Sequence, residues 1–278
     1  MKVMRQLLAR LASADSERIT NGVKSAMQDV VLDGLQRNGF FEYAVFCGDS
    51  CLRIAYGSPR HSGNLDFCLL ESNGDPPLES YFNVLTTEFA SLGMDVEITL
   101  NKKMVRLGAE AFLLRHRYRS FELAVIGDSA LKIPLHLYTL PFKWVTIEEK
   151  QLFEPRQFSI RCFALSDLFI LKMNTLLFSS VKSEVSGRDW FDFEWFITNR
   201  VPLNLSHLIG QFLQPGGLNA QRFSEQEFYD RLESRINAID IAVLKKDVSP
   251  LIKSPEALNV WSQSYFRELT NQLIIIRQ

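Results

Sequence analysis

The sequence lacks a long apolar span, a signal peptide and a strongly basic net charge. No stretch of about 18 apolar residues occurs, so no membrane span is expected. Arg5, Arg10 and Asp15 interrupt the apolar N-terminal stretch, which argues against a signal peptide. The formal net charge is −1, so any nucleic-acid contact would need a local basic patch. These absences predict a cytoplasmic globular protein.

Cysteine is also scarce, and its spacing does not indicate a metal centre. The four cysteines are Cys47, Cys51, Cys68 and Cys162. Cys47 and Cys51 are close in sequence, but no second Cys or His pair follows at zinc-site spacing. No Ser-His-Asp or Cys-His arrangement stands out either. We therefore interpret the cysteines as buried free thiols in a reducing compartment.

The apolar pattern divides the chain into a mixed first part and a helical second part. Periodicity near 3.6 predicts helices, and alternation of apolar and polar residues predicts strands. Expected helices span 2–12, 16–38, 50–56 and 78–92, and expected strands span 43–47, 65–70, 96–100, 111–125, 130–139 and 159–163. Further helices are expected over 166–178, 188–198, 205–212, 225–236, 241–244 and 255–276. The predicted fold class is α/β (α+β), with a mixed sheet in a domain of residues 1–155 and a helical C-terminal domain of residues 156–278.

The segment from Phe46 to Leu69 contains the first candidate site. It reads as a strand end, a Gly48-Asp49-Ser50 turn, a short helix, a polar loop and a second strand. A glycine after a strand lets the backbone approach a phosphate, and the N–H groups at a helix start favour a bound anion. The tripeptide alone favours a plain strand-to-helix turn with a serine or aspartate cap.

Asn64 and Asp66 lie in the second strand of this segment. Residues at i and i+2 of a strand point to the same face, so both would face the Gly48 turn if the two strands are neighbours. Two carboxylates there would hold Mg²⁺, which prefers oxygen ligands and shares them with substrate phosphates. Only Asp66 is a carboxylate, and Asn64 offers an amide oxygen. An aspartate that satisfies turn amides is the alternative.

Polar side chains on two later helices form a further candidate site. Lys172 lies among apolar residues, so it must reach either solvent or an anion such as a triphosphate. Asp189 and Asp192 are i and i+3 neighbours on one helix face. A helix start explains two acids through its dipole, but the surrounding aromatic residues indicate burial, and buried acids need partners. Arg188 or Lys172 could supply them.

A basic strip offers an alternative contact with RNA. Arg115, Arg117 and Arg119 alternate along one expected strand and would share a face. Such a strip could follow phosphates with an aromatic residue nearby. A solvated sheet face explains the same pattern.

Four segments in a fixed order resemble the AbiEii/AbiGii toxin family of nucleotidyltransferases. They are Gly48 to Arg53, Gly57 to Phe67, Leu171 to Asn174 and Arg188 to Asp192, and their spacing covers residues about 40–200. The resemblance implies a polymerase-β-like nucleotidyltransferase core with a helical C-terminal domain. It implies the use of an NTP with Mg²⁺ and transfer of a nucleotide to an acceptor such as tRNA or another RNA. It also implies a toxin role beside a cognate antitoxin protein, with no membrane partner.

The resemblance also implies residue roles. Asp66, Lys172 and Asp189 would be catalytic, and Asp66 and Asn64 would hold the metal. The residues that would bind the nucleotide are Gly48, Ser50, Arg53, Ser62 and Lys172. Asp192 and Arg188 would support Asp189.

Three departures from the family pattern leave catalysis open. Asp49 stands where the family commonly has glycine or another small residue, and its carboxylate would repel phosphate unless it binds a metal. The first acid of the family's Asp-x-Asp pair is Asn64 here, and no acid lies on the expected strand over 131–137. Substitutes for the third acid are Glu122 and the pair Asp95 and Glu97, although both sets could simply face solvent. A non-catalytic relative that keeps the fold and binds a nucleotide or a partner protein is therefore the alternative function.

Overall fold

The computed structural model describes residues 16–70, 76–101, 118–139, 145–178, 186–212 and 223–277. The chain forms two compact units. The first comprises 1–57, 61–141 and 147–163, and the second comprises 58–60, 142–146 and 164–278. Within the described residues, no helix combines the length and the apolar character needed to cross a membrane. The predicted helix over 2–12, the start of the strand over 111–125, Arg115 and Arg117 lie outside the described residues.

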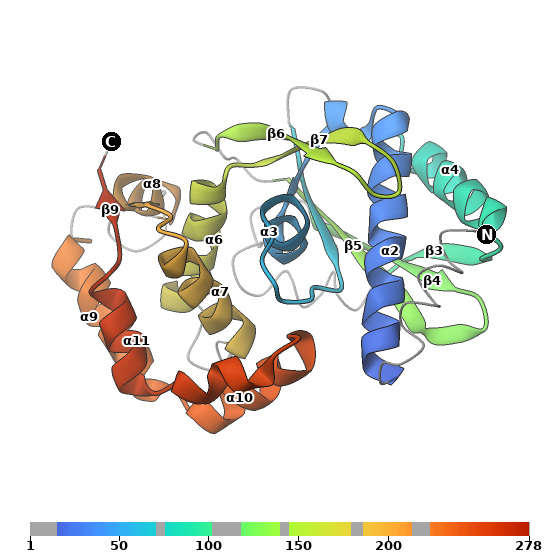
Figure 1. Cartoon of the computed structure of the whole chain (residues 1–278). Coiled ribbons are helices and arrows are strands. Elements are labelled where there is room, and N and C mark those ends of the chain that lie inside the picture. The colour runs from blue at the N-terminus through green and yellow to red at the C-terminus, as the bar shows by residue number, and fades with distance from the viewer. Residues whose placement is uncertain are drawn as a thin grey trace. The chain divides into compact units, whose positions relative to one another are not determined.

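A mixed β-sheet forms the centre of the first unit (Figure 1). In the part of the chain that the structure describes, seven strands lie in the order β3-β4-β5-β2-β1-β7-β6. β2 runs antiparallel to β1 and parallel to β5, while β1 runs parallel to β7. The strands are β1 (Ala44–Cys47), β2 (Leu65–Leu69), β3 (Val96–Leu100), β4 (Tyr118–Val125), β5 (Asp128–Thr139), β6 (Ile147–Leu152) and β7 (Phe158–Phe163). The predicted mixed sheet is confirmed.

Three described helices pack against this sheet or on each other. α2 (Ser16–Arg37) contacts β5 and β7, and α3 (Gly48–Tyr56) contacts β1 and β2. α4 (Leu78–Ser91) packs on α2 and β3. Fully buried aromatic side chains, among them Phe40, Phe46 and Phe67, fill the core. This packing fixes the ends of β1 and β2, where the first candidate site lies.

The second unit is helical, as the apolar periodicity predicts. Its main helices are α6 (Leu165–Phe178), α7 (Gly187–Thr198), α8 (Leu205–Phe212), α9 (Glu225–Ala238) and α10 (Ile241–Val248). α7 and α10 approach closely, because a Cβ added at Gly187 would collide with the carbonyl oxygen of Leu244. A glycine at the start of α7 therefore permits this contact between backbones.

The expected helix over 255–276 is wrong. The segment forms a 3-10 turn, η6 (Pro255–Val260), then α11 (Gln263–Thr270) and the short strand β9 (Ile275–Ile276). Extended backbone at Trp261 ends the turn, and the Ser262 hydroxyl accepts a hydrogen bond from the Tyr265 N–H at 3.1 Å, which starts a new helix. β9 then pairs with β8 (Leu203–Asn204). The break follows from capping and tertiary pairing, which the apolar pattern does not record.

β6 is a strand that the sequence pattern did not predict. It lies at one end of the strand order and carries Glu148, Glu149 and Lys150. Charged residues are common on edge strands, where one side of the backbone has no neighbouring strand. The apolar alternation used to predict strands is therefore weak here.

Candidate functional site

A glycine turn joins β1 to α3. Gly48 has φ 74°, and a Cβ at this position would collide with the carboxylate of Asp66. Glycine is therefore the residue that allows the turn to approach this carboxylate. The side chain of Cys47, the residue that precedes α3, makes no capping hydrogen bond. The residue before α3 therefore does not cap the first turn with its own side chain, and a helix start of this kind favours negative charge.

Asp66 is the centre of a hydrogen-bonded group on β2. Its Oδ1 accepts from His136 Nδ1 at 2.9 Å and from the Tyr138 hydroxyl at 3.1 Å. Its Oδ2 accepts from Asn64 Nδ2 at 2.6 Å. Because a carboxylate only accepts, the bond to His136 places the ring proton on Nδ1. Asp66 and His136 are buried, and both carboxylate oxygens are already engaged.

A chain of hydrogen bonds links this group to α2 and α3. The hydroxyl of Ser50 donates to Ser62 Oγ at 2.9 Å, and Ser62 Oγ donates to Asn64 Oδ1 at 3.1 Å. Gln28 Nε2 donates to the backbone oxygens of Ser62 and Asn64, both at 3.0 Å. Arg53 in turn donates to Gln28 Oε1 at 2.6 Å. Ser50 and Ser62 are buried, so their hydroxyls hold the turn and loop together rather than facing outward.

Asp29, next to Gln28 on α2, has an unusual protonation equilibrium. Burial raises its pKa from 3.8 to about 7, although Arg53 opposes the rise and Glu154 adds to it. The folded chain therefore keeps this carboxyl protonated at pH values where the unfolded chain ionises it. The contribution of Asp29 to the free energy of unfolding falls as the pH rises from the pKa of this group in the unfolded chain to its pKa in the folded chain. The loss is complete above about pH 7.

Asp29→Asn is expected to stabilise the protein at about pH 8 by roughly 4 kcal/mol and to have little effect near pH 4. Urea unfolding followed by circular dichroism at both pH values measures this. Asp95→Asn, at an exposed carboxylate of the same unit, is the control and should leave the pH dependence unchanged. Equal effects of Asp29→Asn at both pH values would contradict the assignment.

The second unit holds a group of two cations and two carboxylates, all of them buried except the partly exposed Asp189. Lys172 Nζ lies 2.8 Å from Asp189 Oδ1 and 2.8 Å from Asp192 Oδ2. Arg60 binds Asp192 with two nitrogens, Nε at 3.0 Å and Nη2 at 2.7 Å. Asp192 is 0% exposed and Arg60 is 2% exposed. Asp189 also accepts from the Ser186 hydroxyl at 2.8 Å, which fixes it at the start of α7.

The predicted site residues therefore fall into two groups, one in each unit. Gly48, Ser50, Arg53, Ser62, Asn64 and Asp66 come together in the first unit, and Lys172, Asp189 and Asp192 come together in the second. Arg188 is exposed, and Arg60 is the arginine that pairs with Asp192. The catalytic, nucleotide-binding and supporting roles of these residues stay predictions.

The sequence did not identify Gln28, His136 and Tyr138 as parts of the first group. Gln28 comes from a helix that carries no motif. His136 pairs in register with Asp66 across β2 and β5, so both side chains lie on one face of the sheet. Only this register, which joins residues 70 positions apart, reveals the contact.

The substitutes considered for the third acid lie elsewhere. Glu122 is on β4 and pairs with Lys132 at 3.3 Å. Asp95 and Glu97 are exposed at β3, the first strand in the sheet order. None of these carboxylates has a hydrogen bond or ion pair with Asp66 among the contacts of the described residues.

The Asp66 group contains a single carboxylate that could hold Mg²⁺. This ion uses one or two carboxylates together with substrate phosphates, and Asp66 is the one carboxylate in this group. Asn64 turns its amide nitrogen, not its oxygen, toward Asp66. Across the residues that the structure describes, no cluster of three or more His, Cys, Asp or Glu side chains could hold a metal ion. The expectation of Mg²⁺ therefore rests on the sequence resemblance alone.

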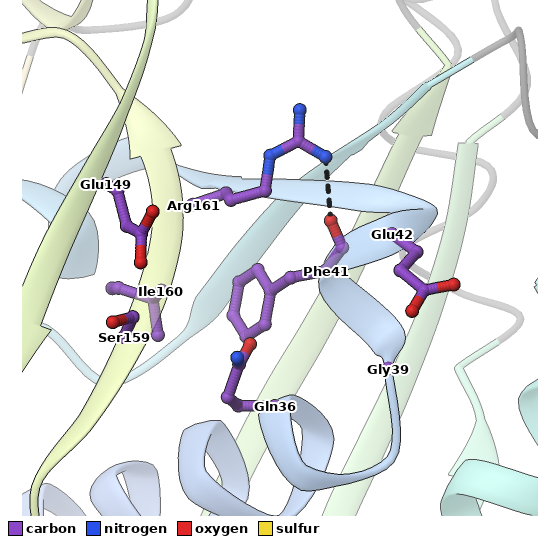
Figure 2. A pocket seen from close by; sticks show the side chains of 8 residues that line it. All are labelled: Gln36, Gly39, Phe41, Glu42, Glu149, Ser159, Ile160 and Arg161. Carbon is purple, nitrogen blue, oxygen red and sulfur yellow. Dashed lines mark hydrogen bonds between the residues drawn. The ribbon is translucent and has the colours of Figure 1, made fainter.

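A cavity of about 290 Å³ also lies in the first unit (Figure 2). Arg161 lines it and donates a hydrogen bond to the backbone oxygen of Phe41 at 3.1 Å. Glu42 and Glu149 line it as well, with Gln36, Gly39, Ser159 and Ile160. It shares no residue with the predicted site. The four cysteines are free and buried, as predicted from their spacing.

Comparison with known proteins shows the family of the chain. A family model described as the nucleotidyl transferase AbiEii toxin of a type IV toxin–antitoxin system matches residues 30–263. No curated protein matches the chain.

Two crystal structures from Helicobacter pylori resemble it. JHP933 is 14% identical with a TM-score of 0.44, covering 91% of this chain and 94% of that chain. A putative nucleotidyltransferase is 16% identical with a TM-score of 0.42, covering 89% and 95%. Because the family model spans most of its length, the chain belongs to the AbiEii family of nucleotidyl transferase toxins.

Proposed function

We propose that this AbiEii family member transfers a nucleotide from an NTP to a hydroxyl group of an RNA acceptor, with tRNA as the first candidate. The observation that carries the proposal is the close approach of the start of α3 to a strand carboxylate. The Gly48 turn permits this approach, and it brings the N–H groups of α3 and Asp66 together. An anion and a reacting hydroxyl can meet at such a place.

The reaction is a displacement at the α-phosphorus. The acceptor oxygen forms a bond to phosphorus, the bond from phosphorus to the β-phosphate oxygen breaks, and pyrophosphate leaves. In this proposal the first N–H groups of α3 bind phosphate oxygens, and Asp66 Oδ2 accepts the proton of the attacking hydroxyl. Asn64, His136 and Tyr138 hold the Asp66 carboxylate in position through the hydrogen bonds described above.

Lys172 and Asp189 keep the roles that the resemblance implies. Lys172 would contact phosphate and Asp189 would orient it. The short distance of 2.8 Å between Lys172 Nζ and Asp189 Oδ1 supports the second role. Family membership also implies an antitoxin partner, since a type IV toxin–antitoxin system contains both proteins.

The test is transfer of label from each of four α-³²P-labelled NTPs to total tRNA, separated on a denaturing gel. Each reaction is run both with and without added Mg²⁺. The proposal expects at least one NTP to label RNA. Total RNA depleted of tRNA serves as the second acceptor and distinguishes tRNA from other RNA. An absence of labelled RNA with every NTP and both acceptors would overturn the proposal.

A non-catalytic relative that binds a nucleotide or a partner protein is the second candidate. Asn64 and His136 favour it, because each stands where the family pattern leads us to expect an acid. This candidate expects NTP binding without transfer. Isothermal titration calorimetry with the same NTPs, run beside the transfer assay, separates the two functions.

A further inference from the structure

Gln28 is a fully buried polar residue on α2, a helix that carries none of the four family segments. Burial of a carboxamide is unfavourable unless its polar atoms have partners, and both polar atoms of Gln28 have them. Nε2 donates to the backbone oxygens of Ser62 and Asn64, both at 3.0 Å. Oε1 accepts from Arg53 Nη2 at 2.6 Å. The side chain therefore joins α2 both to α3 and to the loop between α3 and β2.

These partners determine which way the carboxamide of Gln28 faces. Its nitrogen carries two N–H donors and its oxygen is an acceptor. Two backbone carbonyls on one side need donors, and the guanidinium of Arg53 on the other side needs an acceptor. A reversed amide would set its oxygen against the carbonyl oxygens and its nitrogen against a cation. A glutamate would lose the donors, and an apolar side chain would lose all three hydrogen bonds, so the position requires glutamine.

The contact with the backbone oxygen of Asn64 lies next to the predicted catalytic strand. The Ser50 hydroxyl contacts the same oxygen, so groups from α2 and from α3 both hold it. Because a peptide group is planar, these contacts fix the orientation of the peptide that joins Asn64 to Leu65. β2 begins at Leu65, and Asp66 is its second residue. The peptide that Gln28 holds therefore sets the course of the backbone that leads into Asp66.

The loop before β2 depends on side chains for its position. Residues 61–64 form neither helix nor strand, so a regular backbone ladder does not hold them. Gln28 binds two carbonyl groups of this segment, and one of them belongs to Asn64, which in turn donates to the Asp66 carboxylate at 2.6 Å. A loop held by side chains opens more readily when one of them is removed. Loss of Gln28 should therefore displace the Asn64 and Asp66 side chains without direct contact with Asp66.

We infer that Gln28 is a positioning residue of the proposed nucleotide transfer. It holds the segment that carries Asn64 and Asp66 against the start of α3. The inference rests on the proposed function, because the transfer reaction is the one that it concerns. Gln28 touches no reacting atom and acts through the place of the Asp66 carboxylate. Misplacement of a reacting group by about 1 Å lowers a rate by about a hundredfold, so a small shift of this loop has a large effect.

Gln28→Met tests the inference, because it keeps the length of the side chain and removes its three hydrogen bonds. The kcat of label transfer should fall by about tenfold or more, while the KM for the NTP changes by less than about threefold. Asp66 acts on the attacking hydroxyl in the proposed reaction, which is why kcat carries the effect. Gln36→Met makes the same change on the same helix outside the site and should keep the wild-type kcat. Wild-type kcat in Gln28→Met would overturn the inference and leave the proposed function standing.

Combination with Asp66→Asn separates positioning from a general loss of folding. Thermal melting first shows that each variant is folded at the assay temperature. If Gln28 acts through Asp66, Gln28→Met should lower the remaining transfer of Asp66→Asn by less than about threefold. Two independent contributions would multiply instead. A loss in the Asp66→Asn background as large as the loss in the wild-type background would overturn the inference.

Hydrogen–deuterium exchange measures the hold of Gln28 on the loop without any activity. Peptides that cover residues 61–67 should exchange about tenfold faster in Gln28→Met, the change expected from loss of one or two hydrogen bonds, and α4 should be unaffected. Gln28→Glu should have the same effect, because it sets a carboxylate against the two carbonyls. Unchanged exchange over 61–67 in both variants would overturn the inference. Faster exchange with no transfer by the wild-type chain would support the hold of Gln28 and overturn the proposed function.

Discussion

Asp66→Asn is expected to lower nucleotide transfer by about a hundredfold or more, which is the range that loss of a positioned proton acceptor gives. The substitution keeps the size and shape of the side chain and removes its charge. One of its two terminal atoms becomes a donor and can no longer accept from Asn64 or from His136 and Tyr138. The group thus loses both its base and part of the bonding that positions it.

Stability should change much less than activity in this variant. One or two buried hydrogen bonds are disturbed, depending on which oxygen the amide nitrogen replaces, so we expect the free energy of unfolding to fall by about 1–3 kcal/mol. Initial rates of label transfer and urea unfolding curves provide the two measurements. Asp95→Asn is the control, because Asp95 is exposed and was a candidate for the third acid. Wild-type transfer by Asp66→Asn would rule out Asp66 as the proton acceptor.

Asp192→Ala is expected to destabilise the second unit by about 3–5 kcal/mol, the usual cost of breaking a buried ion pair from one side. Asp192 is fully buried and binds both Arg60 and Lys172. Its removal leaves two buried cations with Asp189 as the carboxylate partner identified for Lys172. Desolvation of the unpaired charge is the source of the loss.

Urea unfolding followed by tryptophan fluorescence measures this loss, because Trp190 is a buried residue of α7. Asp230→Ala, at an exposed carboxylate of α9, should change stability by less than about 0.5 kcal/mol. The triple change Arg60→Met, Lys172→Met and Asp192→Leu should recover much of the stability, because it also removes the two cations that lose a carboxylate partner in Asp192→Ala. A stability of Asp192→Ala equal to that of Asp230→Ala would contradict the assignment.

The predictable part of the fold is the part that local apolar periodicity determines. Buried strands such as β1 and β2 are apolar at every position except Asp66, and α2 repeats at helical spacing, so each is visible in a short window of sequence. Such a window does not predict β6, because β6 is a charged edge strand with little apolar alternation. The final helix was wrong because Ser262 caps a new helix where the apolar pattern continues.

The candidate site was predictable where its residues are close in sequence. Gly48, Ser50, Ser62, Asn64 and Asp66 lie within one segment, and strand alternation alone puts Asn64 and Asp66 on one face. Gln28 and His136 could not be found in this way. Their contacts depend on the packing of α2 and on the register between β2 and β5, and neither is encoded by spacing along the chain.

The charged edge strand β6 also affects how the protein behaves at high concentration. An edge strand offers unpaired backbone N–H and C=O groups to any other strand that approaches. Glu148, Glu149 and Lys150 make such an approach costly, because pairing would desolvate their charges and set like charges opposite one another. The charged residues that make β6 difficult to predict from sequence therefore also protect this edge of the sheet from edge-to-edge aggregation.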